Sequence, residues 1–122
     1  MSNEHPTLGN GKICYLEIPA TDIVVSSNFY KEVFGWNIRK RKDGTTAFDD
    51  GVNEVSGAWK LYRSPSTQVG LLTYIMVDSV DRTLELIKEN GGKIVVPVGM
   101  DYPEITARFS DPAGNVMGIF QQ

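Results

Sequence analysis

The sequence is poor in the side chains that most often bind metals or act as nucleophiles. Among its 122 residues there is one cysteine, Cys14, and one histidine, His5. A single thiol excludes a disulfide within the chain and is typical of a protein from a reducing compartment. Because no histidine is placed to activate a serine or Cys14, a catalytic triad is not predicted. We expect Cys14 to face a helix as an inert core thiol.

The sequence also lacks long apolar runs and an excess of either charge. No apolar run approaches the roughly 18–20 residues that a membrane-spanning helix needs, and residues 1–11 contain no apolar signal-peptide core. A net charge of −3 gives no electrostatic reason to expect nucleic acid or an anionic membrane as a partner. We therefore predict a cytoplasmic protein in which a flexible segment, residues 1–11, precedes one domain, residues 12–122.

What the sequence does contain is an internal repeat. Residues 13–38 and 70–96 each show the pattern of an apolar strand, a turn, an amphipathic helix, glycine and a second apolar strand. At an offset of 57 residues, Tyr15 corresponds to Leu72, Ile18 to Ile75 and Gly35 to Gly92. A shared order of elements at fixed spacing is typical of a duplication. Paired halves tend to enclose a site between them, where small-molecule pockets are preferentially found.

Hydrophobic periodicity and turn residues predict the same elements in each half. Module one covers residues 12–63 and module two residues 69–122, with a linker at Arg63–Thr67. Asp22 is expected to cap the first helix, and Ser79 or Asp78 the second. The predicted fold class is α+β, with two β-α-β-β-β modules and the helices on one sheet face. The predicted helices are Ile23–Phe34 and Val80 to about Asn90; the predicted strands are Ile13–Ile18, Trp36–Lys40, Thr45–Asp49, Val55–Tyr62, Leu71–Val77, Lys93–Val96, Ile105–Ser110 and Val116–Gln121.

Three motifs in this order resemble the vicinal oxygen chelate superfamily, which includes glyoxalase I, bleomycin-resistance proteins and extradiol dioxygenases. The motifs are Phe29–Trp36 after Asp22, then Asn90-Gly91-Gly92, then Phe109–Asn115 with its Asp-Pro-Ala-Gly-Asn turn. The resemblance covers about residues 12–122. It implies paired modules whose mixed sheets curl around a cavity that is commonly completed by a homodimer.

Enzymes of that superfamily commonly hold a divalent metal through His, Glu or Gln from the first and last strands of each module. Carried over by position, these ligands fall on Tyr15, Leu72 and Gly118, while the strand Val55–Tyr62 contains no His, Asp, Glu or Gln. Such a ligand must offer an imidazole nitrogen or a carboxylate or amide oxygen. Tyr15 could bind iron as a phenolate, but one ligand does not make a site. We therefore expect no metal site and no cofactor.

Side chains on the strand faces opposite the helices form the candidate ligand pocket. Alternation places Leu16 and Ile18 toward the first helix, and Thr73, Ile75 and Val77 toward the second. The other face then carries an aromatic pocket with one carboxylate, suited to a flat or cationic ligand; equally, these side chains could simply fill the barrel. The candidate ligand-binding residues are Tyr15, Glu17, Trp59, Tyr74, Met76 and Phe120.

Glu17 has two interpretations. Among Tyr and Leu its carboxyl would be desolvated, which would raise its pKa and make it a candidate general base. Alternatively, a nearby Arg or Lys pairs with it. Two further segments have open roles: Arg39–Lys42 forms either a solvated surface or a contact for an anionic ligand, and Asp101–Glu104 is a loop able to overhang the cavity as a lid.

The favoured hypothesis is a metal-free, homodimeric small-molecule-binding protein resembling the bleomycin-resistance type, holding an aromatic or cationic ligand in its cavity. The alternative is a glyoxalase- or dioxygenase-like enzyme, a lyase or oxygenase, with a divergent or absent metal site, or one that uses Glu17 as its base. A third possibility is a structural or partner-binding module with a filled cavity. Fold alone does not decide among them.

Overall fold

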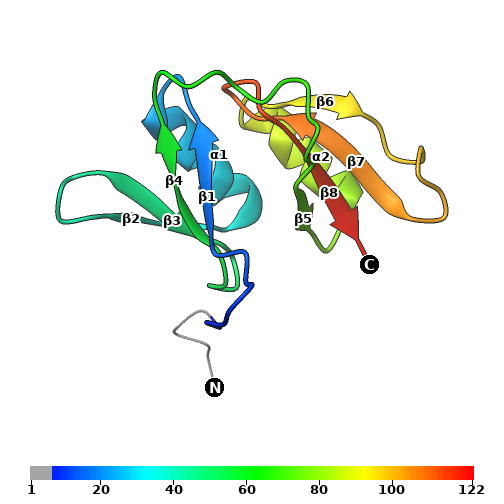
Figure 1. Cartoon of the computed structure of the whole chain (residues 1–122). Helices are drawn as coiled ribbons and strands as arrows, with labels where there is room; N and C mark the ends of the chain where they lie inside the picture. Colours follow the sequence, from blue (N-terminus) through cyan, green and yellow to red (C-terminus); the bar gives the residue numbers. More distant parts are fainter. Residues whose placement is uncertain (1–6) are drawn as a thin grey trace.

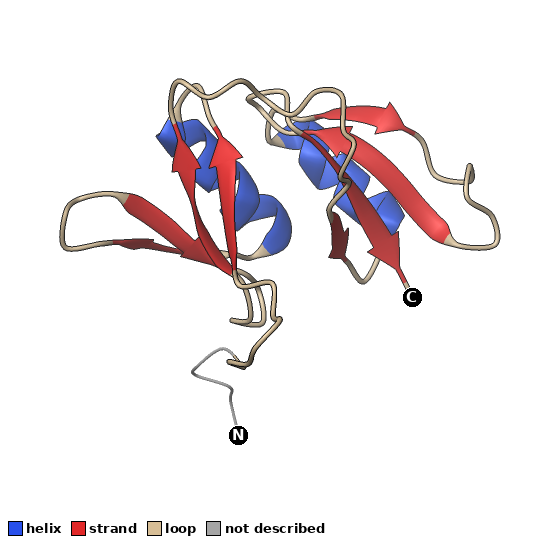
Figure 2. Ribbon diagram, in the orientation of Figure 1, coloured by secondary structure: helices blue, strands red, loops and turns tan. Residues whose placement is uncertain are grey.

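A computed structural model describes residues 7–122, which form two helices and two mixed four-stranded sheets that do not close into a barrel (Figure 1). The predicted α+β class is confirmed. His5 lies outside the described residues. In Figure 2 the helices lie behind the strands, so one face of each sheet is covered by helix and the other is free.

Each module contains the same succession of elements. Module one consists of β1 (Tyr15–Pro19), α1 (Ile23–Phe34), β2 (Asn37–Lys40), β3 (Thr46–Asp49) and β4 (Ser56–Lys60). Module two consists of β5 (Tyr74–Met76), α2 (Val80–Glu89), β6 (Lys93–Val96), β7 (Ile105–Ser110) and β8 (Val116–Gln121). Within residues 7–122, no helix is long and apolar enough to cross a membrane.

The two sheets repeat one topology. The strand order is β1-β4-β3-β2 in module one and β5-β8-β7-β6 in module two. In each module the first strand is parallel to the last, and the remaining pairs are antiparallel. The first strand lies at a sheet edge both times, so the duplication seen in the sequence is a duplication of the fold.

The helix boundaries follow from capping residues. The carboxylate of Asp22 accepts from the Val25 amide at 3.1 Å, and the hydroxyl of Ser79 accepts from the Arg82 amide at 3.1 Å. These bonds satisfy amides that have no partner within the first turn. Gly35, with φ of 71°, ends α1 in the left-handed conformation that glycine adopts without strain.

The glycine correspondence predicted from the repeat is only partly right. Left-handed backbone after α2 falls on Gly91, with φ of 95°, and not on Gly92. Gly92 is needed for a different reason, because a Cβ there would lie 2.7 Å from Ile87 and 2.9 Å from the Phe29 ring. Gly92 therefore permits close packing of module two against α1.

One hydrophobic core spans both modules. α1 packs on its own sheet and against α2, and α2 packs on the second sheet. Phe109, from β7, lies with its ring centroid 6.0 Å from Phe29 and 5.6 Å from Phe34, both on α1. The Tyr30 ring stacks on Trp36 at 4.6 Å. Burial of such aromatic side chains dominates core energetics, so neither module has a core of its own.

A buried polar junction crosses the same boundary. Tyr30 is a fully buried residue of α1, and its hydroxyl donates to one carboxylate oxygen of Asp111 at 2.8 Å. The side-chain amide of Asn115 donates to the same oxygen at 2.9 Å. The other Asp111 oxygen accepts from the backbone amides of Ala113 and Asn115. Burial, and then the Asp111 carboxylate, raise the pKa of Tyr30 well above its ordinary value, so the hydroxyl stays a donor.

Asn115 extends this junction to two further segments. Its amide nitrogen also donates to the carbonyl of Pro19, at the end of β1, at 2.7 Å. Its side-chain oxygen accepts from the Ser66 amide in the linker at 2.9 Å. The turn of the β7–β8 hairpin therefore fixes α1, β1 and the linker through two buried side chains, Asp111 and Asn115.

Cys14 is not the buried core thiol that was predicted. It is exposed and lies one residue ahead of β1. β5 is also shorter than the predicted Leu71–Val77. Val116 donates its amide to Ser66 in the linker, and Gly118 donates to Thr73, so the residues before Tyr74 do not form a regular ladder with β8.

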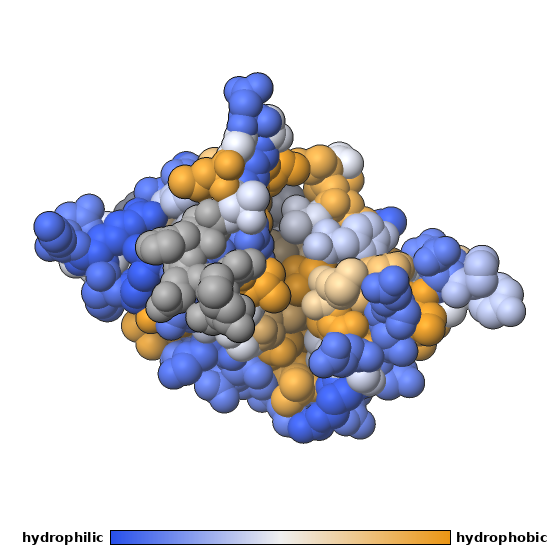
Figure 3. All heavy atoms as spheres, turned by 90° about the horizontal axis from the view of Figure 1, so that it is seen from below, coloured by the Kyte–Doolittle hydropathy of each residue, from blue (hydrophilic) through white to orange (hydrophobic). Residues whose placement is uncertain are grey.

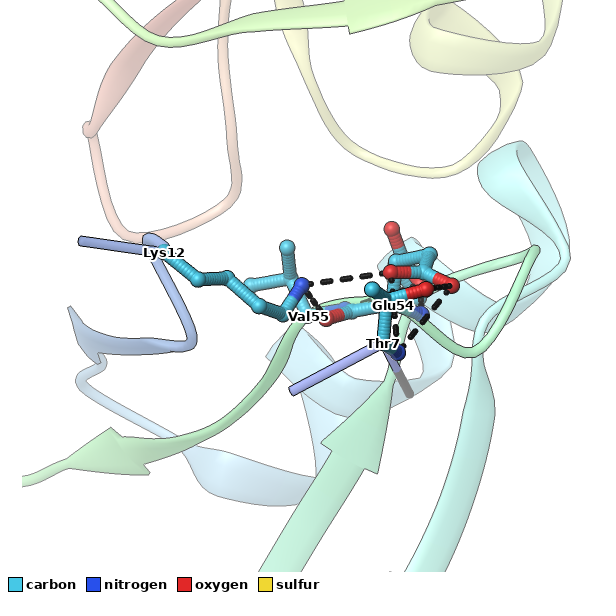
Figure 4. A network of polar contacts seen from close by, with 5 residues as sticks. Thr7, Lys12, Glu54 and Val55 are labelled. Carbon is cyan, nitrogen blue, oxygen red and sulfur yellow. Dashed lines mark hydrogen bonds and ion pairs between the residues drawn. The ribbon is translucent and has the colours of Figure 1, made fainter. Parts of the chain in front are cut away.

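The start of the domain is attached to the β3–β4 loop through Glu54 (Figure 4). The ammonium group of Lys12 donates to the Glu54 carbonyl at 2.6 Å and to its carboxylate at 3.2 Å. The Thr7 amide and hydroxyl donate to the same carboxylate. Hydrogen bonding from Lys12 is the main reason that the pKa of Glu54 is lowered. Flexibility of residues 1–11 stays a prediction.

We predict that Tyr30→Phe destabilises the protein, because Asp111 loses a donor where water cannot replace it. The expected loss in free energy of unfolding is about 1–3 kcal/mol. Tyr62→Phe is the matched control, since Tyr62 is fully exposed, and its effect should stay within about 0.5 kcal/mol. Urea denaturation of both variants measures the difference. Equal stability of the two variants would contradict the structural role of the junction.

Candidate functional site

The free face of the second sheet carries a hollow of about 670 Å³. Its apolar surface comes from the strands, and its two carboxylates come from the loop between β6 and β7. Hollows of about 300–1,000 Å³ with apolar walls and a few polar groups are typical of small-molecule sites. The lining residues are Tyr74, Met76, Asp101, Glu104, Thr106 and Phe120.

Strand register brings the apolar side chains together. Met76 on β5 pairs with Phe120 on β8, and Phe120 pairs with Thr106 on β7. Directly paired residues project from the same face of a sheet. Tyr74 is two residues before Met76 and therefore shares that face. Tyr74 is 43% exposed and Met76 66% exposed, so both side chains are open to a ligand.

The absence of a side chain at Gly118 determines where the Tyr74 ring packs. A Cβ at position 118 would lie 2.5 Å from the Tyr74 ring, closer than real side chains approach. The ring therefore covers the backbone of Gly118, its partner in the β5–β8 ladder. Tyr74 thus forms a flat aromatic wall because glycine stands opposite it.

The carboxylates at the rim are positioned by local hydrogen bonds. The Thr106 hydroxyl donates to the carboxylate of Asp101, and the Glu104 amide donates to the Asp101 carbonyl at 2.9 Å. Glu104 forms no ion pair with any residue in the described part of the chain. The loop expected to overhang a cavity does border one, with Asp101 and Glu104 in its lining.

The free face of the first sheet is polar and carries paired charges. Tyr15 accepts a hydrogen bond from Arg41, whose guanidinium carbon lies 5.6 Å from the centroid of the Tyr15 ring. Arg39 binds Asp49 at 2.9 Å, and Asp49 also accepts from Ser56. The hydrogen bond from Arg39 is the main reason that the pKa of Asp49 is lowered.

Glu17 is an ion-pair partner on this face, so of its two interpretations the pairing with a nearby Arg or Lys is confirmed and the general base with a raised pKa is wrong. Its carboxylate accepts from Arg63 at 2.9 Å and lies 3.8 Å from the ammonium of Lys60. The hydrogen bond from Arg63 is the main cause of a lowered pKa, which the weaker desolvation opposes. A carboxylate held in its charged form by two cations is a poorer base, not a better one.

The structure separates the predicted ligand-binding residues into three places. Tyr74, Met76 and Phe120 meet in the hollow of module two, whereas Tyr15 and Glu17 lie on the free face of the other sheet. Trp59 is a correction, because it is only 3% exposed and lies in the core.

Strand register explains the placement of Trp59. It pairs with Ile18 on β1 and therefore projects toward α1. Its ring centroid is 4.9 Å from that of Phe48. Thr106 was missed by sequence reasoning, although its alternation with the buried Ala107 on β7 placed it on the free face.

Comparison with known proteins decides the family. The sequence profile of the glyoxalase/bleomycin resistance protein/dioxygenase superfamily matches residues 12–119. The chain belongs to this superfamily.

Similar proteins agree with this membership. A glyoxylase-like domain-containing protein from Didymella fabae is 32% identical over 122 residues, covering 90% of this chain and 93% of that one. The crystal structure of a superfamily enzyme from Burkholderia phytofirmans PsJN is 22% identical with a TM-score of 0.75, covering 91% and 98% of the two chains. The crystal structure of TnmS3, an antibiotic-binding protein from Streptomyces sp. CB03234, is 22% identical with a TM-score of 0.67, covering 94% of this chain and 98% of that one.

The residues at the superfamily's metal-ligand positions do not fit a metal centre. Tyr15 is engaged by Arg41, Leu72 has no donor atom, and Gly118 lies beneath the Tyr74 ring. The remaining ligand position lies in β4, the last strand of module one, and β4 contains no His and no carboxylate. Across residues 7–122 no three His, Cys, Asp or Glu side chains converge to hold an ion.

We predict that Arg63→Met raises the pKa of Glu17 toward its ordinary value, because the largest cause of its lowering is removed. A carboxyl with a lowered folded-state pKa contributes stability above its unfolded-state pKa and loses it as the pH falls through the folded-state pKa. The stability that ionised Glu17 contributes above its unfolded-state pKa should therefore be smaller in Arg63→Met than in the wild type. NMR titration of the Glu17 carboxyl carbon measures the shift.

Arg82→Met is the control for this titration. Arg82 pairs with Glu85 on α2, so its loss should leave the pKa of Glu17 unchanged. A Glu17 pKa that is the same in wild type and Arg63→Met would contradict the assigned ion pair.

Proposed function

We propose that this protein binds a small, flat aromatic cation without a metal ion, in the hollow on the free face of the second sheet. The observation that supports this proposal is the combination of an aromatic wall with two carboxylates at one opening. Tyr74, Phe120 and Met76 supply the apolar surface, and Asp101 and Glu104 supply the negative charge.

The physical contributions favour that ligand class. Aromatic stacking adds about 0.5–1.5 kcal/mol beyond area burial. A cation over an aromatic ring adds about 0.5–1 kcal/mol at an exposed site and more where water is excluded. An anionic ligand would meet the carboxylate of Glu104, which has no positive partner among the described residues, so selectivity for cations follows from charge.

The comparisons support small-molecule binding as a use of this fold. TnmS3 is an antibiotic-binding protein by name, and its fold matches over 94% of this chain. The ligand class proposed here rests on the side chains of this chain and not on that neighbour. A metal-dependent glyoxalase or dioxygenase activity is not proposed, because the side chains at the ligand positions do not fit a metal centre and Glu17 is held as a paired carboxylate.

We predict that 9-aminoacridine, a flat aromatic cation, binds this hollow and that Glu104→Gln weakens its binding about two- to fivefold, the loss expected for one exposed charge interaction. Glu32→Gln is the matched control, since Glu32 is an exposed acid on α1 outside the hollow. It should change the affinity little. Isothermal titration calorimetry gives both affinities.

Two results would contradict the proposal. Equal losses in Glu104→Gln and Glu32→Gln would show that binding responds only to net charge and not to the hollow. Stoichiometric binding of Zn²⁺, Ni²⁺ or Fe²⁺ to the purified protein would show that the chain has a metal centre after all.

We further propose that the protein acts in the cytoplasm as a homodimer. Both β1 and β5 are edge strands with no second neighbour in the described chain, and unpaired edges favour association. Light scattering after size exclusion should give twice the mass of 13.5 kDa. A monomeric mass at concentrations of about 100 μM, where dimers with a micromolar Kd are largely formed, would contradict this proposal.

A further inference from the structure

A second cavity lies between the two modules, on the side of the sheets that faces the helices. It is a groove of about 660 Å³, with walls from β1, β3 and the end of α1 in module one and from β5 and α2 in module two. Seen from below, apolar side chains gather at the centre of the molecule, between the modules (Figure 3). We call this cavity the inter-module groove.

The walls of the inter-module groove are apolar because they continue the core. Phe34, Trp36 and Phe48 line it from module one, and Ile75 and Val77 line it from module two. All five belong to the core or pack against it. The core is thus open to solvent where the edge strands β1 and β5 part, which leaves apolar surface for a ligand from outside the chain.

Acidic side chains outnumber basic ones in the lining of the inter-module groove. Arg82 donates to Glu85 at 3.2 Å, so a negative charge already lies beside its guanidinium. Asp50 is fixed in the lining because one of its oxygens accepts from the amides of Glu54 and Val55. Asp78 lines the groove from the other module. The lining therefore holds one carboxylate from each module, Asp50 and Asp78, against the single guanidinium of Arg82.

We infer that the inter-module groove binds a hydrophobic amine, with its apolar body against Trp36, Phe48 and Ile75 and its protonated nitrogen toward Asp50 or Asp78. Apolar contact supplies affinity roughly in proportion to the area removed from water. The two carboxylates select a cation over an anion of the same shape. Tyr74 and Met76 border both cavities, but the carboxylates of this site come from Asp50 and Asp78, whereas those of the hollow proposed above come from the β6–β7 loop.

Decylamine and decanoate test this inference, because the two molecules share one alkyl chain and differ in the charge of the head group. Both are used below their critical micelle concentrations. We expect decylamine to bind with an affinity at least about tenfold higher than decanoate, as charge discrimination at a partly desolvated site allows. Calorimetry gives the affinities, and the fluorescence of Trp36, in the groove wall, reports occupancy.

Val52→Arg locates the binding site. Val52 is 69% exposed and lines the groove, and Val24 is 67% exposed on α1 and does not. Both substitutions add one positive charge at an exposed valine. Val52→Arg should weaken decylamine about tenfold, because its guanidinium competes for the carboxylates and narrows the groove. Val24→Arg should leave the affinity within about twofold, as expected for a distant, screened charge.

The inference is overturned if decanoate binds as tightly as decylamine, or if Val52→Arg and Val24→Arg weaken decylamine equally. It is also overturned if Val52→Arg changes the oligomeric mass but not the affinity for decylamine, which would make this face a contact between copies of the chain. Binding of 9-aminoacridine, and its loss in Glu104→Gln, should be unchanged in Val52→Arg. The two sites can therefore fail independently.

Discussion

The buried hydrogen bonds between Tyr30, Asp111 and Asn115 are the constraint on which the rest of this fold depends. A carboxylate can be buried at tolerable cost only if donors surround it, and here the donors come from α1 and from the β7–β8 turn. The bonds from Asn115 to Pro19 and Ser66 add the end of β1 and the linker. Four segments, the end of β1, α1, the linker and the β7–β8 turn, are therefore fixed at one point. The motifs that mark the superfamily in this sequence, Phe-Tyr on α1 and Asp-Pro-Ala-Gly-Asn in the turn, are the two halves of that junction.

Fixing the modules in this way determines where cavities can form. The helices and Phe109 fill the space near the junction, whereas the sheet edges β1 and β5 part at the opposite end and leave the inter-module groove. β5, only three residues long, separates this groove from the hollow on the free face, and Tyr74 and Met76 border both cavities. The duplication has given the two free faces different chemistry. Module one presents ion pairs around Glu17 and Asp49, and module two presents an aromatic wall with carboxylates.

Much of the fold could be predicted from the sequence, because its signals are local. Helix periodicity, the caps at Asp22 and Ser79 and the β-α-β-β-β repeat are all short-range features, and the structure confirms them. The errors came from features that depend on partners distant in the sequence. Trp59 projects into the core because of its register with Ile18, and the pKa of Glu17 is lowered because Arg63 lies beside it. Cys14 lies just ahead of β1 and is exposed. Gly92 meets Phe29 of the other module, which no pattern within one repeat could indicate.

The most direct test of this account is whether the two modules unfold together. Both tryptophans, Trp36 and Trp59, belong to module one, so tryptophan fluorescence in urea reports that module alone. Native-state hydrogen exchange of the β7 and β8 amides reports module two. Because the core and the buried junction are shared, the account predicts the same free energy of unfolding by both measurements, as for a single cooperative unit. A module two that exchanges its β7 and β8 amides several kcal/mol more easily than module one unfolds would contradict the account.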